Sequence, residues 1–172
     1  ENITVGLFPA GTGNDFCRMI QKCSIEDLCQ MEKTQKIDLI QTEYIDEQGN
    51  CKTRMCLNIA EFGVLAAVVK RYNATSENSR LPGKGPYILS FLKVLKNLSC
   101  PEIMMKLDDG LEQTAKVANV VVANGSFFGS GIRIAPSARI DDGKFNVTIL
   151  KATGRLGLAM TLTKAMCGKN FV

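Results

Sequence analysis

The chain has 172 residues, of which 45% are hydrophobic and 22% are charged, and its formal net charge is +4. These values are typical of a globular domain that can bury a core without a metal or disulfide, and they argue against disorder. No apolar run reaches the roughly 18 residues that a membrane-spanning helix needs. The mild charge, with three tyrosines and no tryptophan, argues against a nucleic-acid partner. The absence of histidine excludes Ser-His-Asp and Cys-His catalysis.

The cysteines and the chain ends indicate the cellular setting. Seven cysteines without a C-x-x-C pair predict reduced, buried thiols and favour a cytoplasmic protein. The sequence begins at Glu1 without an initiator methionine and stops at Val172 directly after a helical pattern. We therefore expect a fragment of a longer protein.

The first segment predicts a strand, a loop and a helix. The β-branched run Ile3 to Phe8 favours a buried parallel strand, which Pro9 ends. Asn14 is a good N-cap and Asp15 would face the positive end of the helix dipole, so we expect a helix to begin here. Ser24 offers a second helix start.

The middle of the chain predicts a hairpin and helices. Alternating residues from Ile37 to Tyr44 and from Lys52 to Ile59 flank the turn DEQGN. The run Val64 to Tyr72 fits either a helix or a strand, and its alanines favour a helix. The stretch 73–86 is polar and predicts a mobile loop. Tyr87 to Leu98 predicts a helix whose apolar stripe we expect to pack in the core.

The last third predicts two more strand pairs and a helix. Asp108 to Gly110 predicts a hairpin between Ile103–Leu107 and Ala115–Ala123, and the second of these strands has no polar face and should be central. A strand from Phe145 to Leu150 and a helix from Leu156 to Met166 should follow.

These elements predict a mixed α/β and α+β fold. We expect residues 1–34 to be the end of an α/β nucleotide lobe, as a strand-loop-helix remnant. Residues 35–172 should form a mostly antiparallel β-rich lobe, of β-sandwich type with inserted helices and incomplete at its C-terminus.

The loop Gly11-Thr12-Gly13 lies between a predicted strand and a predicted helix start. Glycines allow backbone N–H groups to approach a phosphate, and the Thr12 hydroxyl can donate to a phosphate oxygen. However, Phe16 stands where the dinucleotide fingerprint G-x-G-x-x-G requires glycine, and no Gly-Lys-Ser/Thr follows. An ordinary tight turn therefore remains an alternative.

A second glycine loop, NGSFFGSG, follows the predicted central strand at Asn124 to Gly131. Phe127 and Phe128 could form an apolar lip beside a lipid substrate, or they could fold back into the core. A third motif, Asp141-Asp142-Gly143, could bind a hard cation through carboxylate and carbonyl oxygens, or it could be a solvated turn, which is also our interpretation of Asp108 and Asp109.

Taken in order, the motifs resemble those of the diacylglycerol kinase catalytic domain family of lipid kinases, which includes sphingosine, ceramide and soluble bacterial lipid kinases. FPAGTGNDFCR is similar to the family's P-x-G-T-x-N-D-F-A-R, and NIAEFG to its N-x-x-x-x-G. VVVANGSFFGSGIRIAP and ARIDDGKFNV are similar to its A-N-G-x-x-x-G-G-G-x-x-x-A-P and A-x-x-D-D-G-x-x-D-V. The resemblance covers nearly the whole chain, but Ser130 replaces a glycine and Asn146 replaces an aspartate of the family pattern.

The resemblance implies a role for each motif. The nucleotide would be bound by Gly11, Thr12, Gly13, Asn14 and Asp15. A magnesium ion would be bound by the Asp142 side chain and the carbonyls of Arg139 and Lys144. The substrate loop would consist of Asn124, Gly125, Phe127, Phe128, Gly129 and Gly131. The family's G-G-D-G-T loop and the acidic base of its D-G-E motif are not found in this sequence.

The implied activity is transfer of the ATP γ-phosphoryl group to a diacylglycerol-type lipid hydroxyl at a membrane surface, with ATP and Mg²⁺ as cofactors. We expect the parent protein to be cytoplasmic and peripheral to the membrane, and the fragment alone to be inactive. Homo-oligomerisation through exposed strand edges stays open. The alternatives are a kinase of a soluble substrate such as NAD and a non-catalytic lipid-binding paralogue.

Overall fold

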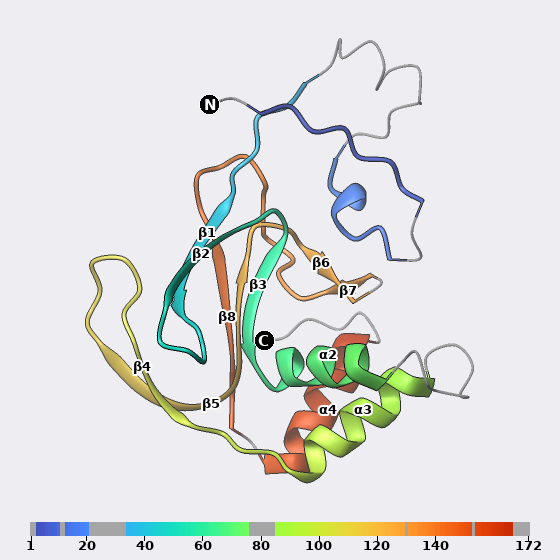
Figure 1. Ribbon diagram of the computed structural model, residues 1–172, viewed down its shortest axis with the longest axis vertical. Helices are drawn as coiled ribbons and strands as arrows, with labels where there is room; N and C mark the ends of the chain where they lie inside the picture. The colour runs from blue at the N-terminus through green and yellow to red at the C-terminus, as the bar shows by residue number, and fades with distance from the viewer. Residues whose placement is uncertain are drawn as a thin grey trace. The chain divides into compact units, whose positions relative to one another are not determined.

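The computed structural model of the chain describes residues 3–10, 13–20, 34–75, 85–129, 131–152 and 154–166 (Figure 1). The helix expected at Ser24 and most of the polar loop 73–86 lie outside these ranges. The chain forms two compact units. Unit 1 contains residues 1–60, 122–147 and 164–172, and unit 2 contains residues 61–121 and 148–163.

Unit 1 contains two short hairpins. The first pairs β1 (Ile40–Ile45) with β2 (Cys51–Cys56) in antiparallel register, which confirms the predicted hairpin over a shorter range. Its turn is held by the Asp46 carboxylate, which accepts the N–H groups of Gln48 at 3.0 Å and Asn50 at 2.8 Å. The second pairs β6 (Phe127–Phe128) with β7 (Ile132–Arg133) inside the second glycine loop.

In the N-terminal segment the predicted strand is wrong, and the predicted helix is confirmed only in part. Ile3 to Phe8 forms no strand, and the side chains of Ile3, Val5 and Phe8 are exposed. A strand needs a neighbour to accept its hydrogen bonds, and within the described residues none pairs with this run. The helix is a single 3₁₀ turn, η1 (Phe16–Arg18), whose N-cap is Asp15.

Unit 2 contains most of a four-stranded sheet and its helices. Strand β5 (Gln113–Ala123) is central, as predicted, and pairs with β3 (Ile59–Gly63), β4 (Glu102–Met105) and β8 (Asn146–Lys151). The β4–β5 pair is antiparallel, as the Asp108–Gly110 turn predicts. The helices are α2 (Val64–Thr75), α3 (Gly85–Lys96) and α4 (Gly154–Met166). Helix α2 continues directly from β3, and α4 follows shortly after β8 (Figure 1).

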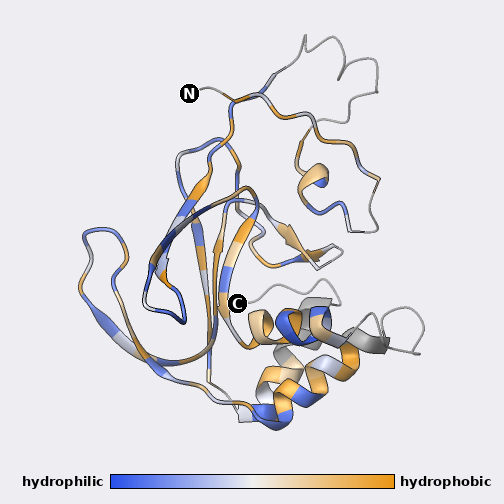
Figure 2. Ribbon diagram, viewed as in Figure 1, coloured by the Kyte–Doolittle hydropathy of each residue, from blue (hydrophilic) through white to orange (hydrophobic). Residues whose placement is uncertain are grey.

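The buried hydrophobic side chains of unit 2 come from β5, β8, α2 and α4. Helices α2 and α3 pack against each other, and each carries both hydrophobic and hydrophilic residues (Figure 2). The buried side chains are Val64, Leu65, Val68, Val117, Ala118, Val120, Val121, Leu150 and Leu158. The helix predicted over Tyr87 to Leu98 is confirmed, but its apolar stripe is not fully in the core, because Ile88, Leu89 and Leu92 are exposed.

The structure also bears on the predicted burial of the thiols and on the question of a membrane-spanning helix. Cys51 is exposed, whereas all thiols were expected to be buried. Among the described residues no helix has both the length and the apolar character that a bilayer-spanning helix requires.

Gly63 forms the sharp junction between β3 and α2. Its φ of +117° is a conformation that side chains rarely adopt, and a Cβ here would overlap the Ala118 carbonyl oxygen and lie 2.8 Å from Asn119 Cα. The close approach allows the buried Asn119 side chain to accept the first-turn N–H of Leu65 at 3.0 Å. The junction therefore supplies a side-chain cap for α2.

We predict that Gly63→Ala lowers the free energy of unfolding by about 2–4 kcal/mol, because it adds backbone strain to a steric overlap. Gly49→Ala is the matched control, since Gly49 also has a positive φ of +84° but has no atom within 4 Å of an added Cβ. It should cost about 1 kcal/mol. Urea unfolding curves give the free energy of unfolding of each variant. Equal decreases in the two variants would contradict the steric argument.

Glu61 on β3 is a half-buried carboxyl group beside Asn119. Burial raises the pKa of Glu61 above its ordinary value of 4.5, and the neighbouring Asn119 amide opposes this only in part. Because the folded-state pKa is raised, this group favours folding at low pH, and that contribution is lost as the pH rises from 4.5 through the raised value.

We predict that Glu61→Gln removes this loss, so that the variant gains stability relative to the wild type as the pH rises through that window. The measurement is the free energy of unfolding as a function of pH. Glu102→Gln, which replaces an exposed carboxylate of the same sheet, serves as the control. A wild-type-minus-variant difference that does not change with pH would contradict the assignment.

Candidate functional site

The loop around η1 in unit 1 is shaped by Asn14. The Asn14 backbone has a positive φ of 49°, and its Nδ2 donates to the Pro9 carbonyl at 3.3 Å. On the other side of this loop, the Arg18 side chain donates to the Gly13 carbonyl at 3.4 Å. Gly11 and Thr12 lie outside the described residues, so their nucleotide-binding role stays a prediction.

The second glycine loop lies against η1, because β6 contacts this turn. The Ser126 N–H points at the Met19 sulfur at 2.8 Å. The guanidinium carbons of Arg18 and Arg133 each lie 5.9 Å from the centre of the Phe127 ring, within the range of cation–π attraction. Two sequence motifs more than a hundred residues apart thus form one surface that carries two arginines.

The burial of Phe127 and Phe128 matches neither of the two alternatives, an exposed apolar lip or a buried core position. Phe127 and Phe128 are both half-buried in β6, so neither is a fully exposed lip or a fully buried core residue. Gly131 has a φ of +104°, and a Cβ there would lie 3.1 Å from the Arg18 guanidinium. The glycine therefore permits the close approach of Arg18.

Buried asparagines hold the second loop in place. The Asn124 side chain is fully buried, and its Nδ2 donates to the carbonyls of Asp38 at 2.7 Å and Leu57 at 3.0 Å. Asn58 donates from Nδ2 to the Phe127 carbonyl at 2.9 Å and accepts the N–H groups of Asn124 and Gly125 at its backbone oxygen. A Cβ on Gly125 would overlap Asn58 Oδ1. The loop is therefore positioned by two amides and one glycine.

Asp38 connects this network to the Asp-Asp-Gly turn. Its Oδ2 accepts the Gly143 N–H at 2.7 Å, and its backbone N–H donates to the Ile140 carbonyl at 2.7 Å. Sequence reasoning missed Asp38, because its partners are about a hundred residues away and an isolated aspartate before a strand gives no local signal. The family-like position of Asn58 was recognised, but its hydrogen bonds were not predicted.

The turn itself distinguishes its two aspartates. Asp141 is engaged by side chains, since its Oδ2 accepts from Gln35 at 3.2 Å and its Oδ1 lies 3.6 Å from Arg139 Nε. Asp142 Oδ1 instead accepts a backbone group, the Lys144 N–H at 3.0 Å, and both aspartates are exposed. Among the described residues no group of three or more aspartate, glutamate or cysteine side chains is placed so that it could hold a metal ion. A magnesium ion shared with nucleotide phosphates needs only one or two carboxylates, so Asp142 fits that kind of site.

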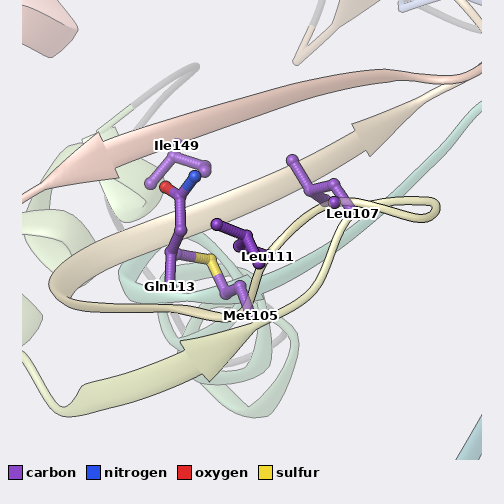
Figure 3. A pocket seen from close by; sticks show the side chains of 6 residues that line it. Met105, Leu107, Leu111, Gln113 and Ile149 are labelled. Carbon is purple, nitrogen blue, oxygen red and sulfur yellow. The ribbon is translucent and has the colours of Figure 1, made fainter.

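A small pocket lies in unit 2 (Figure 3). Its side chains come from β4, β5, β8 and the connection between β4 and β5, and it is lined by Met105, Leu107, Gly110, Leu111, Gln113 and Ile149. None of these residues is an acid, base or nucleophile, so the pocket offers no catalytic chemistry.

Comparisons with known proteins identify one family. The YegS C-terminal NAD kinase beta sandwich-like domain matches residues 58–172. A diacylglycerol kinase of Bacillus subtilis (strain 168) is 26% identical over 173 residues, which cover 97% of this chain and 53% of that protein. A diacylglycerol kinase of Mycobacterium tuberculosis is 27% identical and is covered over 50% of its length. The chain thus spans about half the length of these relatives.

Solved structures agree on the fold. The crystal structure of a diacylglycerol kinase from Bacillus anthracis str. Sterne aligns with a TM-score of 0.51 and 20% identity over 94% of this chain and 48% of its own. A second structure from that organism aligns with a TM-score of 0.55 and 21% identity over 90% of this chain and 50% of its own. The expected fold class, a mixed fold with antiparallel sheets and inserted helices, is confirmed.

We predict that Asn124→Asp lowers the free energy of unfolding by about 2–4 kcal/mol, because it replaces two buried N–H donors by a carboxylate that faces two carbonyl oxygens. Asn97→Asp makes the same chemical change at an exposed position and should cost less than about 0.5 kcal/mol. Urea unfolding measures both variants. Equal effects at the two positions would show that the Asn124 bonds are not required.

Proposed function

We propose that this chain, which belongs to the family of YegS C-terminal NAD kinase beta sandwich-like domains, is part of an ATP-dependent lipid kinase. The full-length protein would transfer the γ-phosphoryl group of ATP to the hydroxyl of a diacylglycerol-type lipid. The names of the curated relatives support a lipid acceptor.

The observation that carries the proposal is the contact between η1 and the second glycine loop. Phosphoryl transfer depends mainly on positioning and on stabilising negative charge. The contact places Arg18 and Arg133 around Phe127, next to a loop whose backbone geometry is fixed by Asn14. Such a surface suits the phosphates of a nucleotide and the acceptor that must meet them.

Each motif has a proposed role in this reaction. Gly11, Thr12, Gly13, Asn14 and Asp15 would bind the nucleotide, and the loop Asn124 to Gly131 would orient the acceptor. Asp142, with the carbonyls of Arg139 and Lys144, would hold Mg²⁺, which neutralises phosphate charge when bound. We keep residues 1–34 and 35–172 as the proposed portions of the nucleotide and acceptor lobes. We assign no general base to this chain.

A soluble acceptor such as NAD is the second candidate, because the matched family is described as NAD kinase-like. The test incubates the full-length protein with radiolabelled ATP and either diacylglycerol in mixed micelles or NAD. Label in the lipid supports the proposal, and label only in NAD favours the second candidate. No transfer to any acceptor above a no-enzyme blank would contradict both and leave the non-catalytic paralogue.

We predict that Thr12→Ala lowers kcat/KM for ATP by roughly tenfold to a hundredfold, because it removes a hydroxyl donor to a phosphate oxygen. The readout is initial rate against ATP concentration. Thr53→Ala, at an exposed position of β2, is the control and should retain wild-type kinetics. An unchanged kcat/KM in Thr12→Ala would remove Thr12 from the nucleotide site.

We also predict that Asp142→Asn raises the Mg²⁺ concentration for half-maximal rate by roughly tenfold to a hundredfold. The chain offers a matched control in its other Asp-Asp-Gly turn, where Asp109→Asn makes the same change. Magnesium titrations of the two variants decide the assignment. An equal response in both would sink the proposal that Asp142 holds the metal.

A further inference from the structure

Strand β4 has an open outer edge. Among the described residues it pairs only with β5, in an antiparallel register that places Ile103 opposite Ala115. The Val117 N–H donates to the Pro101 carbonyl at 3.1 Å, so the odd-numbered residues of this segment direct their backbone groups toward β5. The backbone N–H and C=O groups of the even-numbered residues therefore point away from the sheet.

The side chains of this edge separate charged from apolar surface. Glu102, Met104 and Lys106 are exposed, and as alternate residues of an extended segment they share one face. The residues between and beside them belong to the other face and are all apolar, namely Pro101, Ile103, Met105 and Leu107. Met105 and Leu107 also line the small pocket of unit 2 (Figure 3). The edge thus offers a mixed-charge face and an apolar face.

The order of these residues is self-complementary about Met104. In an antiparallel pair of two β4 strands related by a two-fold axis at Met104, Glu102 of one copy lies opposite Lys106 of the other, and symmetry forms this pair twice. On the apolar face Ile103 lies opposite Met105. An axis at Glu102 or at Lys106 would instead place two like charges opposite each other, which is destabilising. The charges therefore select one register.

We propose that β4 pairs with β4 of a second copy of this chain, so that two four-stranded sheets join into one sheet across a two-fold axis at Met104. The pairing gives hydrogen-bond partners to the outward backbone groups of β4. It also covers Met104, which is 69% exposed, and brings together the two apolar faces, beside which Leu107 is 51% and Leu111 87% exposed. A peptide of one charge would match only one end of the edge, whereas a second copy matches both.

Sedimentation velocity of the full-length protein over a range of concentrations tests this pairing. The wild type should form a reversible dimer. Glu102→Lys and Lys106→Glu should each weaken self-association at least roughly tenfold, because each variant replaces two attractive pairs by two repulsive ones. Lys151→Glu is the matched control, since it makes the same charge change at an exposed position of β8, and it should dimerise like the wild type.

Combining the two charge reversals tests the register. An equimolar mixture of Glu102→Lys and Lys106→Glu chains should form a heterodimer, because each chain then offers the charges that the other lacks. The double variant should recover wild-type association, because its opposite charges are only exchanged. A monomeric wild type, a dimer that both single variants retain, or a double variant or mixture that stays monomeric would overturn the proposal.

Cross-linking locates the two-fold axis. Residues opposite each other in a hydrogen-bonded antiparallel pair have Cα atoms about 5.5 Å apart, within the range of a disulfide. Met104→Cys should therefore give a disulfide-linked dimer on mild oxidation, above the wild-type background from exposed Cys51. Thr114→Cys is the control, because Thr114 is exposed opposite Met104 on β5 and its two copies would lie about 14 Å apart. Equal cross-linking of the two variants would contradict this axis.

The pairing and the kinase assignment stand or fall separately. The proposed interface contains none of the residues proposed to bind nucleotide, metal or acceptor, and the sedimentation and cross-linking experiments need no substrate. A dimer that depends on Glu102 and Lys106 in a protein that transfers no phosphate would support the interface and contradict the kinase proposal. Phosphate transfer by a protein that stays monomeric would do the reverse.

Discussion

The geometry of the candidate site depends on one buried amide. The fully buried Asn124 side chain donates to two backbone carbonyls, those of Asp38 and Leu57. A buried N–H donor without a partner costs about as much as a lost hydrogen bond, so the Asn124 amide favours the single arrangement in which it reaches both carbonyls. These hydrogen bonds join the loop after β5 to the end of β2 and to the segment before β1.

The hydrogen bonds of Asn124 also determine where the proposed ligand-binding residues lie. Asp38, fixed by Asn124 through its carbonyl, binds the Asp-Asp-Gly turn through its carboxylate. Asn58 donates to the Phe127 carbonyl, and the guanidinium groups of Arg18 and Arg133 each lie within cation–π range of the Phe127 ring. Thus the proposed acceptor loop and the proposed metal turn are positioned by hydrogen bonds of Asn58, Asn124 and Asp38, none of which is itself a proposed metal ligand. Such support allows the exposed residues to remain free for ligands.

Features that depend on residues close together in the sequence were predicted correctly. The DEQGN and DDG turns located their hairpins, because turn residues act over a few positions, and the unbroken apolar run of β5 identified the central strand. The ordered motifs also identified the family correctly. Ile3 to Phe8 was placed wrongly because strand formation requires a partner elsewhere in the chain. Asp38 was missed for the same reason, and the exposed stripe of α3 was assigned to the core because periodicity alone does not say what covers a face.

The central claim is that the loop around η1 and the loop after β5 form one nucleotide-facing surface. Photo-crosslinking of the full-length protein with an azido-ATP, followed by peptide mapping, tests it most directly. The account predicts labelled peptides from both residues 9–19 and residues 124–133, with the labelling suppressed by excess ATP. Specific labelling confined to other parts of the protein would contradict it.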